Sequence, residues 1–146
     1  RDSGGFAEAF ARGGADLDLK ISFFERGHPM YHCEEVFYTY RSSRDSGVFG
    51  KRQRTLADVV IKTVERHPVF FADAAVRDEF LKWGICTSIR ANIYAGHRIA
   101  ALRYVVTGFR FFGFLRRQFW VWAFYVLLGK SGMELGRKIR NMVGFP

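Results

Sequence analysis

Residues 4–18 read GGFAEAFARGGADLD, and this stretch decides the fold that the sequence predicts. It contains two glycine pairs, an aromatic residue after the first pair, and the aspartates Asp16 and Asp18. The apolar residues that follow alternate with polar ones and are compatible with a strand. The glycines in front, the two early acids and Gly27 behind are instead signals of helix boundaries, so we expect a helix over residues 16–26.

The composition of the 146-residue chain is that of a folded domain, with 49% hydrophobic and 25% charged residues. Its formal net charge of +9 is uneven, because residues 90–146 contain ten Lys and Arg but a single acid, Glu134. Such a basic region suits an anionic surface, either lipid headgroups or nucleic acid, although a solvated basic face explains it equally well. Cys33 and Cys86 lack metal-binding spacing, and we interpret both as buried thiols.

The rest of the chain is predicted to be mostly helical. Aromatic and β-branched residues at 30–40 favour one or two short strands, and the polar residues 44–54 indicate a mobile loop. Helices are expected from Thr55 to His67, at residues 72–95, and from Ile99 to Val106; the signature from Ser131 to Glu134 begins a short basic helix to about Met142. The predicted inward positions of the first two are Leu56, Val59, Val60, Val64, Ala75, Val76, Phe80, Trp83 and Ile89.

Residues 108–128, GFRFFGFLRRQFWVWAFYVLL, form the most aromatic stretch. Its longest uncharged run is residues 119–128, whereas a spanning helix needs roughly 20 residues. We therefore expect an interfacial helix whose aromatic rings lie at headgroup depth while its arginines meet anionic lipid. The predicted membrane-contact residues are Arg110, Arg116, Arg117, Trp120 and Trp122. Packing of these aromatic residues onto the domain, or onto a missing domain, remains the alternative.

A single aspartate at the start of the expected helix is a candidate general base. Two residues that are two positions apart on a helix project about 200° from each other, so Asp16 and Asp18 cannot easily share a metal ion. A single carboxylate in the first turn is stabilised by free N–H groups and by the helix dipole, and can act as a general base. The alternative is that both acids only mark a helix start. The four histidines lack a ligand-like spacing, so we predict no metal site, and without a nucleic-acid motif we predict no nucleic-acid partner.

The order of the motifs resembles a known family. G-G-F-x-E at residues 4–8, G-x-D-L-D-L at 14–19, Gly27 and MYHCEEVFYTYR at 30–41 are similar to the end of the catalytic domain of family 2 glycosyltransferases, which have the GT-A fold. The resemblance implies an α/β, Rossmann-like fold class. Its implied domains are residues 1–43 as the end of the GT-A catalytic domain, 44–54 as a mobile loop, and 55–146 as a mostly α-helical region.

The resemblance also implies roles for individual residues. Asp16 takes the position of the base that deprotonates the acceptor hydroxyl. Ala7 and Ala15 stand where the family pattern has an aspartate and a glutamate. The implied substrate-binding residues are Gly4, Gly5, Phe6, Asp18 and Arg41.

The implied activity is inverting sugar transfer from a nucleotide-diphosphate sugar to a polysaccharide or lipid-linked acceptor. A divalent metal, Mg or Mn, would be bound by an upstream motif that is absent from this sequence, so the chain would be the C-terminal part of a longer enzyme and inactive alone. We expect a cytoplasmic location at the inner face of the plasma membrane, with peripheral membrane contact and a homodimer both compatible. The alternative is a non-enzymatic, helical membrane-peripheral or interaction protein.

Overall fold

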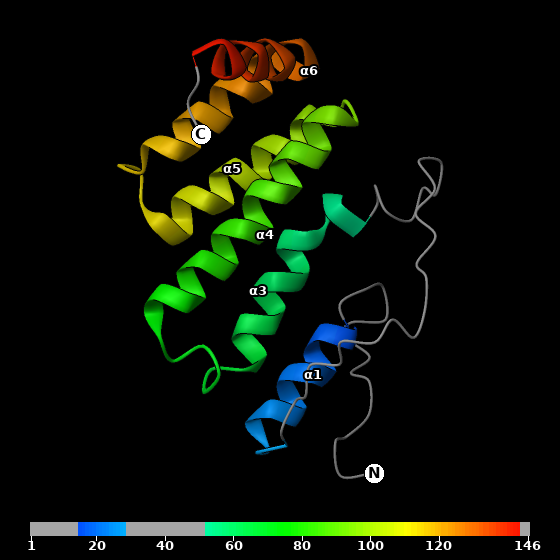
Figure 1. Ribbon diagram of the computed structural model, residues 1–146, viewed down its shortest axis with the longest axis vertical. Helices are drawn as coiled ribbons and strands as arrows, with labels where there is room; N and C mark the ends of the chain where they lie inside the picture. The colour runs from blue at the N-terminus through cyan, green and yellow to red at the C-terminus, as the bar shows by residue number, and fades with distance from the viewer. Residues whose placement is uncertain (1–14, 29–51, 144–146) are drawn as a thin grey trace.

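The computed structural model describes residues 15–28 and 52–143, and every regular element in these two ranges is a helix (Figure 1). The main elements are α1 (Ala15–Glu25), α3 (Leu56–Arg66), α4 (Ala74–Tyr94), α5 (Arg98–Phe112) and α6 (Arg117–Val143). The described part of the chain is therefore all-helical, and the expected α/β fold class is wrong for it. The strands expected at residues 30–40 lie outside the described residues, as does most of the expected loop, of which residues 52–54 form a helical turn.

Within the described residues, α1 packs on a helix end and a turn. Its buried face contains Asp18 and Ile21 and lies against the end of α3 and the turn that follows it. Phe24 on α1 and Phe70 in that turn also meet edge to face, with ring centroids 5.3 Å apart.

Glycines set the ends of three helices. Gly27, Gly96 and Gly113 follow α1, α4 and α5, and each has a φ between +77° and +80°, a conformation that costs glycine little. The helices expected at residues 16–26 and 72–95 are confirmed to within two residues at each end. Gly113 also divides the aromatic stretch 108–128, so the single helix expected there is wrong: its first part ends α5 and its second part begins α6.

Helix α4 lies at the centre of the packing, with α3, α5 and α6 all against it (Figure 1). One buried row along α4 is small or polar and contains Gly84, Ser88 and Asn92. The neighbouring row is aliphatic, and burying each such side chain contributes about 1.5–3 kcal/mol. The core joins four helices through Ala57, Ile85, Ile89, Ile93, Ala101, Tyr104, Val105, Phe119 and Val126.

The small row lets α3 approach α4 closely. A Cβ atom on Gly84 would lie 2.7 Å from Cγ2 of Val60, which no real side chain tolerates without movement. The Ser88 hydroxyl accepts the Ala57 amide at 2.8 Å, and the Asn92 amide nitrogen donates to the Arg54 carbonyl at 2.9 Å. These buried polar side chains therefore satisfy backbone groups at the start of α3.

This arrangement overturns several of the predicted inward positions. Val60 and Ile89 are buried as expected, but Val76 and Trp83 are about half exposed, and Ala75 is also exposed. The remaining predicted positions are partly buried. The apolar residues alone misplace the buried face because Gly84, Ser88 and Asn92 occupy much of it.

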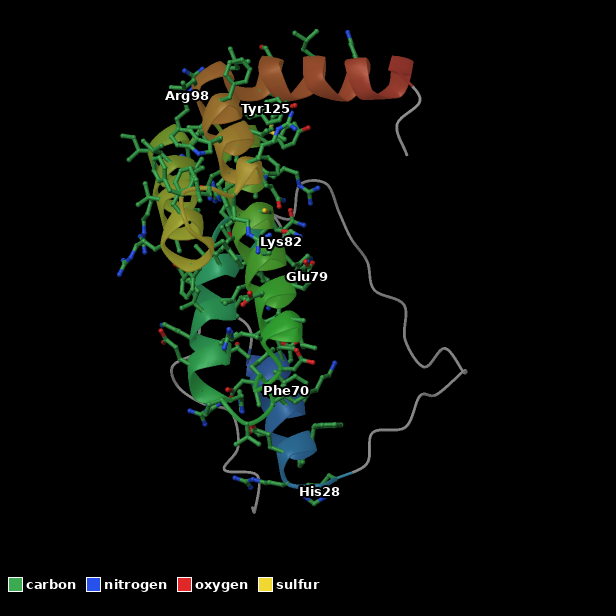
Figure 2. The ribbon with its side chains drawn as sticks, turned by 90° about the vertical axis from the view of Figure 1, so that its left-hand side faces the viewer. His28, Phe70, Glu79, Lys82, Arg98 and Tyr125 are labelled. Carbon is green, nitrogen blue, oxygen red and sulfur yellow. The ribbon has the colours of Figure 1, made fainter. Side chains whose placement is uncertain are left out.

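Helix α6 bends at Gly129, whose backbone (φ 68°, ψ −154°) is not helical. Figure 2 shows Arg98 and Tyr125 near this bend, beyond which the helix turns across the end of the bundle. The short basic helix expected after Ser131 corresponds to this second half. Among the described helices, none combines the length and the apolar character that a membrane span requires.

Candidate functional site

The two aspartates at the start of α1 lie in different environments. Asp16 is exposed in the first helical turn, where the positive end of the helix dipole stabilises a carboxylate. Asp18 is only 1% exposed, because its position on α1 faces the end of α3. The predicted divergence of two side chains that are two positions apart on a helix is therefore confirmed.

Asp18 is held by two residues from the end of α3. Its Oδ1 lies 3.0 Å from Nε of Arg66 and 2.9 Å from Nε2 of His67. His67 is the C-cap residue of α3, where its own amide donates to the Thr63 carbonyl, and Pro68 prevents the helix from continuing. The end of α3 therefore presents two basic side chains to one buried carboxylate.

Glu25 binds the other side of the same imidazole. Its Oε2 lies 2.7 Å from Nδ1 of His67, and its Oε1 accepts the Phe70 amide at 3.1 Å. Asp18 and Glu25 are seven residues apart, about two helical turns, and so share one face of α1. Each ring nitrogen of His67 therefore lies within hydrogen-bond distance of a carboxylate oxygen from α1.

We call Asp18, Glu25, Arg66 and His67 the acid–base cluster. It brings two carboxylates together with one imidazole and one guanidinium, and His67 is only 3% exposed. Charge-assisted hydrogen bonds of this kind are the stronger ones, and both nitrogens of the imidazole are engaged. The cluster can therefore fix α1 on α3, but His67 has no free nitrogen with which to act on a substrate.

The predicted site residues are only partly within the described ranges. Asp16 lies at the surface and Asp18 in the acid–base cluster, while Gly4, Gly5, Phe6 and Arg41 lie outside the described residues. Residues 15–28 and 52–143 contain no group of three His, Cys, Asp or Glu side chains that could hold a metal ion.

Sequence reasoning missed three members of this cluster. Spacing along the sequence relates a histidine only to its near neighbours, whereas His67 contacts Asp18, which lies 49 positions away in the chain. The available signal was the seven-residue separation of Asp18 and Glu25, which places two acids on one helix face that needs basic partners.

The basic aromatic segment forms the hairpin between α5 and α6. Arg110, Arg116 and Arg117 are exposed, and Trp120 is 48% exposed with its Nε1 donating to the Phe114 carbonyl at 2.9 Å. Trp122 is partly buried and packs against the core. Of the five predicted membrane-contact residues, four therefore lie at the surface and one faces inward.

An open groove of about 1050 Å³ lies between α3 and α5. Its lining is mixed, with Asp58 and Glu65 from α3 opposite Arg103 and Val106 from α5. At the inner side of this α3–α5 contact Tyr104 donates to Oδ2 of Asp58 at 2.8 Å. Burial and this hydrogen bond raise the pKa of the Tyr104 phenol well above its usual value, so it remains a donor and is not set up as a base.

Cys86 is only partly buried, whereas the sequence is interpreted as giving a buried thiol. Cys33 lies outside the described residues. Gln118 approaches its Sγ at 3.4 Å. Burial raises the pKa of the Cys86 thiol, which disfavours the reactive thiolate.

Protein-family models, curated proteins and solved structures were each searched, and none gave a match to this chain. The side chains around α1 and on the α5–α6 hairpin are therefore the basis for a functional proposal.

Proposed function

We propose that this chain is the C-terminal part of a nucleotide-sugar-dependent, inverting glycosyltransferase in which Asp16 is the catalytic base. One observation carries the proposal: of the two carboxylates in the motif, Asp16 is exposed while Asp18 is locked in ion pairs. The order of the glycine and acidic motifs along the sequence supports the same reaction class.

The proposed reaction requires one general base from this part of the protein. The Asp16 carboxylate would accept the proton of an acceptor hydroxyl as that oxygen attacks the anomeric carbon of the donor. The bond from the anomeric carbon to the diphosphate then breaks, and the nucleoside diphosphate leaves with the electron pair. Residues that bind the donor are expected in a part of the enzyme beyond this sequence.

The acid–base cluster suits this role because a base must be held in position. Asp18 and Glu25 lie two turns apart on α1 and both contact His67. These two contacts restrain the rotation and the tilt of α1. A general base acts only within hydrogen-bond reach of its proton, and small misplacements are costly. Asp18 and Glu25 are thus positioning residues, and Asp16 is the residue that meets the substrate.

The test is Asp16→Asn in the full-length protein. We expect sugar transfer to fall by about 10²–10⁴-fold, the usual contribution of a general base, while binding of the donor nucleotide is retained. Asp78→Asn removes a half-exposed carboxylate from α4 and serves as the matched control, with activity near that of the parent. Unchanged turnover in Asp16→Asn would remove Asp16 from the role.

A second candidate function is a non-enzymatic interaction protein. The observation that favours it is the exposed, basic and aromatic hairpin between α5 and α6, which lies far from α1 (Figure 1). Calorimetric titration of the full-length protein with uridine and guanosine diphosphates separates the two candidates. Binding supports the transferase, and absence of binding to either nucleotide supports the interaction protein.

A further inference from the structure

The outer face of the first half of α6 is apolar and exposed. Positions 117, 120, 121, 124, 127 and 128 share one face by the helical period, while Phe119 and Val126 point to the core on the opposite side. Phe124 is 58% exposed and Leu127 74% exposed, although most residues of this size are expected to be covered. We call this face, together with Phe114 of the preceding turn, the hairpin strip. Its apolar members are Phe114, Trp120, Val121, Phe124, Leu127 and Leu128.

The turn between α5 and α6 continues the hairpin strip. The Phe114 ring meets Trp120 edge to face with centroids 4.6 Å apart, and Leu115 beside it is 99% exposed. The hairpin strip therefore runs from the turn along about three turns of helix, as one surface and not as scattered single residues.

The charged side chains of the two helices of the hairpin, from α5 through the first half of α6, have one sign. Arg110 lies at the end of α5, and Arg116 and Arg117 lie at the start of α6, all exposed. No Asp or Glu occurs anywhere between Glu79 and Glu134. The partner that this surface fits is therefore apolar and anionic at once.

From these observations we propose that the hairpin strip is a docking surface for the headgroup region of an anionic lipid bilayer. The first half of α6 is about 18 Å long, so it would lie in the plane of the interface and not cross it. The arginines at the hairpin turn would then meet the anionic headgroups while the apolar face enters the acyl boundary. This inference does not depend on the glycosyltransferase proposal.

Trp120 is suited to this depth. Its indole N–H already donates to the Phe114 carbonyl, so the ring can leave water without an unsatisfied donor. Tryptophan is enriched at membrane–water interfaces for its amphipathic ring. The hydrogen bond also ties the turn to the helix, which orders the hairpin strip before it binds.

A second copy of the chain is a poorer occupant. A two-fold symmetric contact through the hairpin strip would bring the same patch of both copies together, and with it Arg116 and Arg117 of each. No acidic residue of α5 or the first half of α6 is available to neutralise them. A bilayer containing anionic lipid supplies the opposite charge at the same place.

The experiment is vesicle flotation of the full-length protein with phosphatidylcholine alone and with phosphatidylcholine mixed with phosphatidylglycerol. We expect binding to the mixed vesicles only. Arg116→Gln with Arg117→Gln should weaken it by on the order of 20-fold, about fivefold for each charge. Leu127→Ser with Phe124→Ser should weaken it at least tenfold.

Matched controls use the same substitutions elsewhere. Ile99→Ser with Leu102→Ser changes exposed apolar residues that line the groove on α5, and Arg77→Gln changes a partly exposed arginine on α4; neither should alter binding. Circular dichroism melting verifies that each variant folds. No binding to the mixed vesicles, equal losses in the controls, or self-association that Leu127→Ser abolishes without any vesicle binding would each overturn the proposal.

Discussion

Replacing Asp18 by asparagine is expected to release α1 from the other described helices without unfolding them. Helix α1 is attached through the acid–base cluster, the buried Ile21 and the ring contact of Phe24 with Phe70. The helices α3 to α6, in contrast, share one core. The structure therefore predicts local opening of α1 as a separate event.

The magnitude follows from the burial of the ion pair. Asp18 and His67 are 1% and 3% exposed, and removing one partner of a buried pair costs roughly 3–5 kcal/mol because the other charge is left uncompensated. We take the lower end, about 3 kcal/mol, because asparagine keeps an oxygen acceptor and Arg66 is half exposed to water. This corresponds to a rise on the order of 100-fold in the population of open α1.

Hydrogen exchange measured by mass spectrometry is the assay. Peptides covering residues 15–25 should exchange roughly 100-fold faster in Asp18→Asn, or lose protection altogether, while peptides from α4 and α5 are unchanged. Asp16→Asn is the matched control, since it removes an identical group from the same helix turn but at an exposed position, and should shift exchange by less than about fivefold. Equal exchange in the two variants, or loss of protection throughout α4, would refute the anchoring role.

Two further outcomes test the buried hydrogen bonds between α3 and its neighbours α4 and α5. Ser88→Ala removes the partner of the Ala57 amide and of the Gln53 carbonyl, so urea unfolding should show a loss of about 1–3 kcal/mol, whereas Thr87→Ala, off the buried row, should show much less. The second concerns Tyr104, whose pKa is raised by burial and by Asp58: above about pH 10 the unfolded state loses this proton and the folded state keeps it, so stability falls as pH rises. The parent should lose up to about 1.4 kcal/mol per pH unit more than Tyr104→Phe in that range, and parallel curves would contradict the assignment.

The helices could be predicted from the sequence more securely than their faces. Glycine has local effects that a sequence pattern records, so the ends of α1 and α4 at Gly27 and Gly96 follow from composition. The buried face of α4 does not follow from composition, because Ser88 and Asn92 are buried in order to hydrogen-bond backbone groups at the start of α3. Those partners lie more than 30 positions away, where no periodicity of α4 records them.

The candidate site divides in the same way. That Asp16 and Asp18 face apart is fixed by helix geometry, and the structure assigns each a side. The choice of which aspartate is buried depends on Arg66 and His67, which contact Asp18 from the last residue and the C-cap of α3, just before Pro68. Under the proposed role of Asp16 as the base, a variant that breaks the Asp18 anchor should lower turnover even though the Asp16 carboxylate is still present. Measured together, a fall in turnover for Asp18→Asn that follows its increase in exchange would separate positioning from chemistry, since Asp16→Asn should lose turnover with no increase in exchange.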